Sequence, residues 1–90
     1  MSEPIIQQLR QFLIKDLYVD LPAEQIGPDD GLQTVHGLDS VCFIELRMLC
    51  EEHYGITIDD AEFSPEHFRT LSALAQLIGS KVAGQELGHG

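Results

Sequence analysis

The chain has 90 residues, enough for one small domain, and its hydrophobic fraction of 43% excludes wholesale disorder. Fifteen acidic residues against five basic ones leave a formal net charge of −10, which argues against nucleic-acid binding and favours encounters with basic protein surfaces. The N-terminus lacks a signal-like segment and no apolar run approaches the roughly 20 residues of a membrane span, so we expect a cytoplasmic protein that does not bind membranes.

The first predicted element is a helix with one apolar face over residues 4–17, where apolar residues recur at helical spacing. Residues 18–39 are predicted to form a long connection, because proline and glycine recur there too often for a regular element. A loop of this length needs apolar anchors in a compact domain. We expect four residues to pin it to the core: Leu21, Ile26, Leu32 and Val35.

A second helix is predicted over residues 40–54, with Asp39 as its N-cap and Gly55 in a left-handed conformation at its end. A surface helix ordinarily has one apolar face, but this helix has two. Either it is sandwiched between neighbours, or its second stripe is a partner or ligand surface. The stripe expected to face the core is Phe43, Leu46, Cys50 and Tyr54, and the second stripe is Val41, Ile44 and Met48.

The second half of the chain predicts two further helices. After an extended piece at 56–58, Ser64 and Pro65 are typical of a helix start and predict a brief helix over 65–69. A last helix is predicted over 70–82, and residues 84–90 are expected to be a flexible C-terminal tail beyond a domain of residues 1–83. The predicted fold is all-α, a small four-helix bundle with three longer helices, one short helix and a long first loop.

The two cysteines, Cys42 and Cys50, are expected to be reduced. They lie two helical turns apart, so about 12 Å separates their Cα atoms, which is too far for a disulfide. The histidines and cysteines show no metal-ligand spacing, so no metal site is predicted.

Ser40 opens the second helix directly after its acidic cap. A catalytic serine needs a histidine base and an oxyanion hole, and Ser40 lacks the G-x-S-x-G surroundings of a nucleophile elbow. His36 is close in sequence but is interpreted as a loop residue, so we predict that the chain is not an enzyme. A phosphate ester suits the position better, because a helix N-terminus offers free N–H groups and the positive end of the macrodipole.

Residues 37–41 (GLDSV) resemble the modification motif of acyl carrier proteins. Residues 40–58 (SVCFIELRMLCEEHYGITI) are similar, without gaps, to the second helix of that family and the segment after it. The order of four helices and the long first loop also match, so the likeness covers about residues 4–82. It implies that residues 1–83 form an acyl-carrier domain.

The resemblance implies a role for each matching residue. Ser40 corresponds to the serine that accepts a 4′-phosphopantetheine arm from coenzyme A, and Asp39 to the residue that helps present the serine and its metal to the phosphopantetheinyl transferase. Arg47 departs from the pattern, because fatty-acid carriers usually have an apolar residue there. The positions on the family's partner-facing side of the second helix are Val41, Ile44, Glu45, Met48 and Glu52.

The function that the resemblance implies is a discrete, monomeric acyl carrier protein, which holds acyl intermediates as thioesters. Residues 60–71 look more like free-standing carriers of specialised pathways, such as polyketide synthesis, than like carriers of fatty-acid synthesis, and both pathways stay open. The expected partners are the transferase, an acyl-loading enzyme and downstream synthase or modifying enzymes. Two alternatives remain: a peptidyl or aryl carrier of a nonribosomal pathway, and an unmodified acidic helical adaptor that holds a partner helix.

Overall fold

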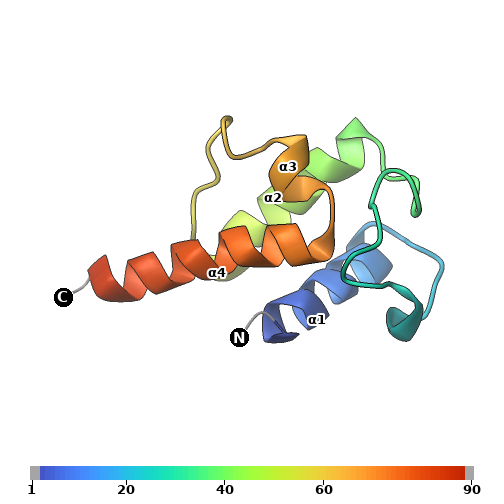
Figure 1. Cartoon of the computed structure of the whole chain (residues 1–90), viewed down its shortest axis with the longest axis horizontal. Helices are drawn as coiled ribbons and strands as arrows, with labels where there is room; N and C mark the ends of the chain where they lie inside the picture. The colour runs from blue at the N-terminus through green and yellow to red at the C-terminus, as the bar shows by residue number, and fades with distance from the viewer. Residues whose placement is uncertain (1–2, 89–90) are drawn as a thin grey trace.

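All elements of this computed structural model are helical within residues 3–88, the part of the chain that it describes, with side chains described as far as residue 84. In chain order they are α1 (Glu3–Gln11), the π-helical turn η1 (Phe12–Asp16), the 3-10 turn η2 (Ala23–Gln25), α2 (Ser40–Tyr54), α3 (Pro65–Phe68) and α4 (Leu71–Gly88). The prediction of an all-α fold with three longer helices, one short helix and a long first loop is confirmed (Figure 1).

The first helix ends in an unusual way. α1 continues directly into η1, where the Leu17 N–H donates to the Phe12 carbonyl at 3.0 Å, five residues back. The Val19 N–H donates to the Leu13 carbonyl at 2.8 Å, and Tyr18 between them lies in the left-handed region with φ 59°. Glycine ordinarily closes a helix in this conformation, because a Cβ costs about 1–2 kcal/mol there. Asparagine is the next choice, because its short side chain can hydrogen-bond locally.

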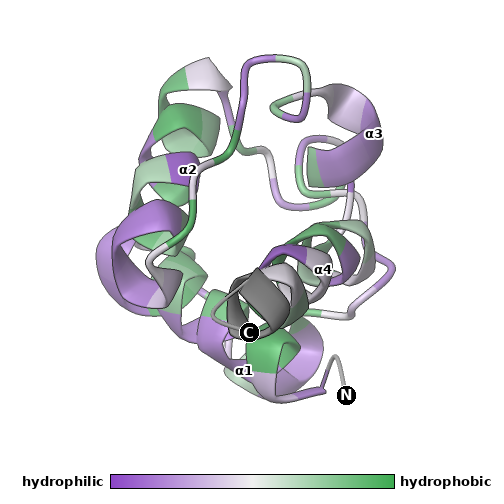
Figure 2. Ribbon diagram, turned by 90° about the vertical axis from the view of Figure 1, so that its left-hand side faces the viewer, coloured by the Kyte–Doolittle hydropathy of each residue, from purple (hydrophilic) through white to green (hydrophobic). Residues whose placement is uncertain are grey.

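The core lies between the three longer helices. α1 packs along α4 (Figure 1), and viewed end-on α2 and α3 lie on different sides of α4 (Figure 2). Hydrophobic residues follow much of α2 in Figure 2. The first loop contributes to the core together with the helices, as the largest fully buried side chains show: Leu9, Leu13, Ile26, Leu32, Leu46, Cys50, Ile58, Leu71, Leu74 and Ile78.

Hydrogen bonds fix the long first loop in place. The Leu32 N–H donates to the Arg69 carbonyl at 2.9 Å, and the Ser72 N–H donates to the Pro28 carbonyl at 2.9 Å. From α1, the Arg10 guanidinium donates to another carbonyl of the loop at 2.8 Å. The loop is therefore a fixed wall of the domain, joined both to α1 and to the junction of α3 and α4.

Three of the four predicted loop anchors pack inward, but the prediction for Val35 is wrong, since its side chain is 61% exposed. Residues 31–37 form helix-like turns through their backbone hydrogen bonds. His36 lies one helical turn after Leu32 and faces inward, with a side chain that is only 2% exposed. Leu38, 4% exposed, supplies the next anchor.

The predicted end of the last helix near residue 82 is also wrong, because α4 continues to Gly88. The helix passes through Gly84, since a glycine inside a helix costs only about 1 kcal/mol relative to alanine. Residues 89 and 90 of the predicted tail lie outside the described residues, and the domain limits and the flexibility of the tail stay predictions. Neither α4 nor any other helix in the described range is long and apolar enough to span a bilayer.

Candidate functional site

α2 begins at Ser40 because Asp39 caps it. The Asp39 backbone is extended, and its Oδ1 atom accepts the Cys42 N–H at 2.9 Å. This bond to the ionised carboxylate holds the pKa of Asp39 below its ordinary value of 3.8. Gly37, with φ 70°, turns the chain just before the cap, in a conformation that suits glycine. The predicted N-cap is confirmed, and so is the left-handed C-terminal glycine, Gly55, at φ 64°.

The Ser40 side chain is exposed on the first turn of α2. Across the described residues no group bonds its hydroxyl, and Asp39 already fulfils the capping role. His36 is turned into the loop, where its Nε2 atom lies 3.5 Å from an Asp30 carboxylate oxygen. Since the N–H groups of the first turn have no intrahelical partners and the helix end is positive, a phosphate ester on this hydroxyl fits the site.

The two apolar stripes of α2 lie in different environments. Leu46 and Cys50 of the inner stripe are fully buried, while the outer stripe of Val41, Ile44 and Met48 is 70%, 49% and 54% exposed. The sandwiched alternative is therefore wrong, because no element covers the outer stripe in the described structure. Glu45 and Glu52 are exposed on the same helix. All five predicted partner-facing residues reach solvent; their use by partners stays a prediction.

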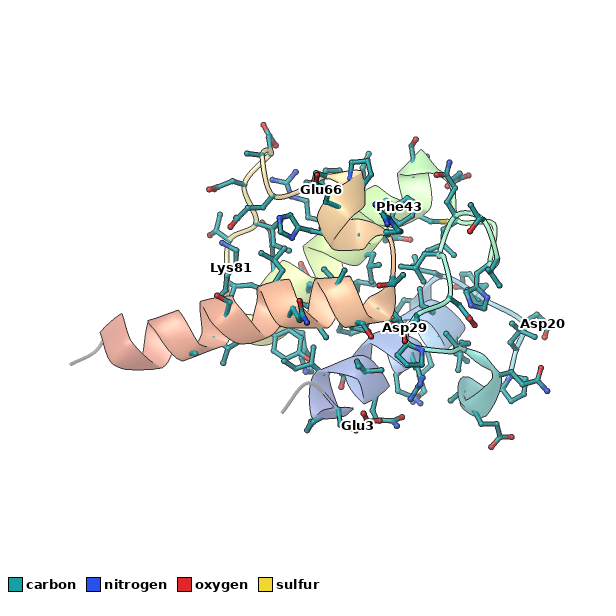
Figure 3. All side chains as sticks on the ribbon, in the orientation of Figure 1. Glu3, Asp20, Asp29, Phe43, Glu66 and Lys81 are labelled. Atoms are coloured by element: carbon teal, nitrogen blue, oxygen red, sulfur yellow. The ribbon has the colours of Figure 1, made fainter. Side chains whose placement is uncertain are left out.

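A cleft of about 660 Å³ opens beside Ser40, between α2, α3 and the first loop. Three aromatic rings line it: the Phe63 and Phe68 ring centroids are 5.0 Å apart, and those of Phe43 and Phe68 are 6.4 Å apart. Figure 3 shows Phe43 between α2 and α3. The sequence analysis missed this cleft, because its walls come from three segments that meet only in the fold. The one available signal was the pair of phenylalanines between the second and last helices.

Arg47, the departure from the family pattern, braces one wall of this cleft. Its guanidinium carbon lies 5.1 Å from the centroid of the Phe63 ring, a cation–π contact. One guanidinium nitrogen lies 3.1 Å from an Asp60 carboxylate oxygen, and another donates to the Ile58 carbonyl. Arg47 therefore holds the segment between α2 and α3 against α2.

A second ion pair holds the same segment from α4. Lys81 Nζ lies 2.7 Å from Glu62 Oε1, which also accepts the Asp59 N–H at 3.0 Å. The Lys81 bond is the main reason that the pKa of Glu62 lies below its ordinary value of 4.5. In Figure 3, Lys81 rises from α4 toward this segment. Contacts from two helices thus fix the aromatic wall of the cleft.

Both cysteines are free thiols. Burial raises the pKa of Cys50 to about 12, and partial burial also raises the pKa of Cys42 above its ordinary value of 9.0. Both groups are therefore protonated at neutral pH and are weak nucleophiles. Within the part of the chain that the structure describes, no three histidine, cysteine or acidic side chains gather as a metal site.

The fold and the site together define a class: a small helical domain with an exposed serine at the start of a helix whose outer face is exposed. The hydroxyl of this serine has no hydrogen-bond partner within the described residues. Comparison with known families supports the same class, since residues 7–78 match the phosphopantetheine attachment site family. The chain belongs to this family. Its cofactor is 4′-phosphopantetheine, bound covalently, and the protein is a phosphopantetheine-carrying carrier protein. Carrier domains of this family are modified by phosphopantetheinyl transferases, interact with enzymes and are typically not catalysts.

Proposed function

We propose that Ser40 carries the phosphopantetheine and that the protein works as an acyl carrier. The observation that carries this proposal is the free, exposed Ser40 hydroxyl at the N-terminus of α2, beside a helix cap that is already complete. When bound, the arm supplies a terminal thiol that holds the acyl group as a thioester. The domain itself holds Ser40 in place and offers surfaces to the enzymes that load, modify and unload the acyl group.

Attachment follows from ordinary phosphoryl-transfer chemistry. Ser40 Oγ forms a P–O bond to the phosphorus of coenzyme A that bears the pantetheine. The pyrophosphate bond on the other side of that phosphorus breaks, adenosine 3′,5′-bisphosphate leaves, and the hydroxyl proton passes to a base on the transferase. The new phosphodiester lies at the positive end of α2, where its charge is favourable.

The proposed pathway is of the specialised type, such as polyketide synthesis, with fatty-acid synthesis as the second candidate. Arg47 and the segment it braces support this choice, because both depart from the sequence pattern that fatty-acid carriers usually show. The strong net negative charge of −10 favours an acyl carrier over a peptidyl or aryl carrier. Loading with a malonyl donor against an aminoacyl donor distinguishes these classes.

The attachment is tested by the intact mass of the protein after incubation with coenzyme A and a broad-specificity transferase. We expect the wild type to gain one phosphopantetheine and Ser40→Ala to gain none. Ser64→Ala is the matched control, because Ser64 lines the same cleft but is not at the α2 N-terminus, and it should be modified fully. An unmodified wild type would favour the helical adaptor instead.

A further inference from the structure

Tyr18 combines a strained backbone with a side chain that packs little against the fold. It lies in the left-handed region at φ 59°, at the end of η1, where glycine is unstrained and asparagine is tolerated. Its side chain is 84% exposed, so its packing offsets little of this strain. A strained residue without a structural reason indicates a functional one, and an exposed tyrosine is typical of the central contacts of protein interfaces.

Tyr18 borders a hollow that is separate from the aromatic cleft. The hollow has a volume of about 310 Å³ and shares no lining residue with the cleft. Val35, the exposed loop residue, lines it together with Tyr18. Cys42, two residues after Ser40 in the chain, also lines it. An exposed aromatic and an exposed aliphatic side chain therefore line one hollow near the first turn of α2.

The enzyme that acts at Ser40 has to cover this region. Enzymes that work on the finished carrier reach its cargo along a flexible arm, so they can bind at a distance from Ser40. The transferase attaches the arm, so it cannot use the arm to reach Ser40. The reacting phosphorus of its bound coenzyme A must come within bonding distance of Ser40 Oγ. A protein seated there extends over neighbouring residues, and the hollow is lined by residues on both sides of Ser40 in the chain: Gly37, Leu38 and Cys42.

The charge around the hollow specifies the chemistry of the contact. Asp16 and Asp20 are exposed on either side of Tyr18, and Asp39 is exposed at the start of α2. Asp20 projects from the outer end of the first loop (Figure 3). Lys15 is the one exposed cation in residues 15–20, so the surroundings of Tyr18 are acidic. The complementary surface presents an apolar side chain between lysines or arginines.

We propose that Tyr18 and Val35 form a docking contact for the phosphopantetheinyl transferase, which inserts an apolar side chain flanked by basic residues into the hollow beside Ser40. This inference rests on the proposed attachment at Ser40. It adds a contact on the first loop to the outer stripe of α2, with Tyr18 as its main residue.

The test compares kcat/KM for loading from coenzyme A by a broad-specificity transferase. Tyr18→Asn removes the ring and suits the left-handed backbone, so we expect kcat/KM to fall about tenfold, mainly through KM, with thermal stability equal or higher. Val35→Thr is expected to lower kcat/KM about threefold, as a smaller apolar contact. Gln25→Ser, an exposed uncharged change in the same loop but outside the hollow, is the matched control and should load like the wild type.

Several results would overturn this inference. If Tyr18→Asn leaves kcat/KM unchanged while the wild type loads at Ser40, the proposed docking contact is wrong and the proposed attachment stands. A lower melting temperature in Tyr18→Asn shows that the ring stabilises the fold, and a wild-type dimer that this variant dissociates shows that Tyr18 contacts a second copy. If the wild type is not loaded at all, the attachment and the docking contact are both wrong.

Discussion

Asp39 connects the stability of α2 with the place of the candidate attachment residue. Its carboxylate accepts the Cys42 N–H, and this bond starts the helix one residue later, at Ser40. The serine is thereby left without a structural task. An acidic cap followed by a free hydroxyl separates two roles that a single capping serine would combine.

The lowered pKa of Asp39 predicts a pH dependence of stability. Because this pKa is lower in the folded chain than its ordinary value of 3.8, the ionised carboxylate stabilises the fold above that value, and the stability is lost as the pH falls through the folded pKa. We expect the free energy of unfolding, measured by urea titration, to fall between about pH 5 and about pH 3. Asp39→Asn keeps an acceptor at the cap and should show a shallower fall. Identical pH profiles would contradict this role.

The two thiols are expected to differ in reactivity. With a pKa of about 12, Cys50 is ionised in only about one molecule in 10⁴ at pH 8, and it is fully buried. In apo-protein pulsed with iodoacetamide, peptide masses should show Cys42 alkylated first and Cys50 alkylated only on unfolding. Equal rates for the two cysteines would mean that α2 opens far more readily than its packing indicates.

α2 has two faces because only one of them packs on the core. Its inner stripe is packed inward, whereas its outer stripe, with Glu45 and Glu52, is exposed. The periodicity of the sequence predicted both stripes. The choice between a sandwiched and an exposed second stripe required the fold, because it depends on which elements pack around α2.

Charge reversal at Glu45 tests the outer face as a docking surface. We expect Glu45→Lys to lower kcat/KM for loading about tenfold at low salt and much less at high salt, with unchanged helical circular dichroism. Glu66→Lys, on α3 (Figure 3), makes the same change in net charge and is the matched control. Equal losses in the two variants would point to net charge instead of a docking face.

A substitution at Met48 tests whether the outer stripe contributes to the stability of the fold. Because its side chain is 54% exposed, Met48→Lys should change the free energy of unfolding by no more than about 0.5 kcal/mol. The comparison is Leu46→Lys, which places a charge in the core and should unfold the domain. A large loss of thermal stability in Met48→Lys would place this residue in a packed interface of the fold itself.

The three longer helices could be predicted from their apolar patterns, and the short one from Ser64 and Pro65 at its start. The errors come from local geometry that no pattern reveals. Val35 is exposed since a helix-like turn brings His36 inward instead. α4 passes through Gly84 because a helix tolerates one glycine. Tyr18 ends the first helix without a glycine, and the cleft forms where separate segments meet.

The domain is held together across its segments by a few cations in an acidic chain. Arg47 and Lys81 fix the segment between α2 and α3, and Arg10 fixes the first loop. Both segments are walls of the surfaces around Ser40. These three basic residues of a strongly acidic protein therefore hold in place the segments that surround Ser40.

Arg47 provides the strongest test of this bracing. Arg47→Met removes the ion pairs with Asp60 and Glu51, the bond to the Ile58 carbonyl and the cation–π contact. It should cost about 1–2 kcal/mol of unfolding free energy. Arg47→Lys keeps the charge but loses the planar fork, so it should recover only part of that loss. Chemical denaturation measures both, and full recovery by lysine would show that charge alone holds the segment.

The most direct test of the account is to locate the modification in the protein after co-expression with a phosphopantetheinyl transferase. Fragmentation of the peptide that spans the start of α2 should place a single phosphopantetheine on Ser40, and Ser40→Ala should carry none anywhere in the chain. A modification on another residue, or an unmodified Ser40 in fully folded protein, would contradict the account.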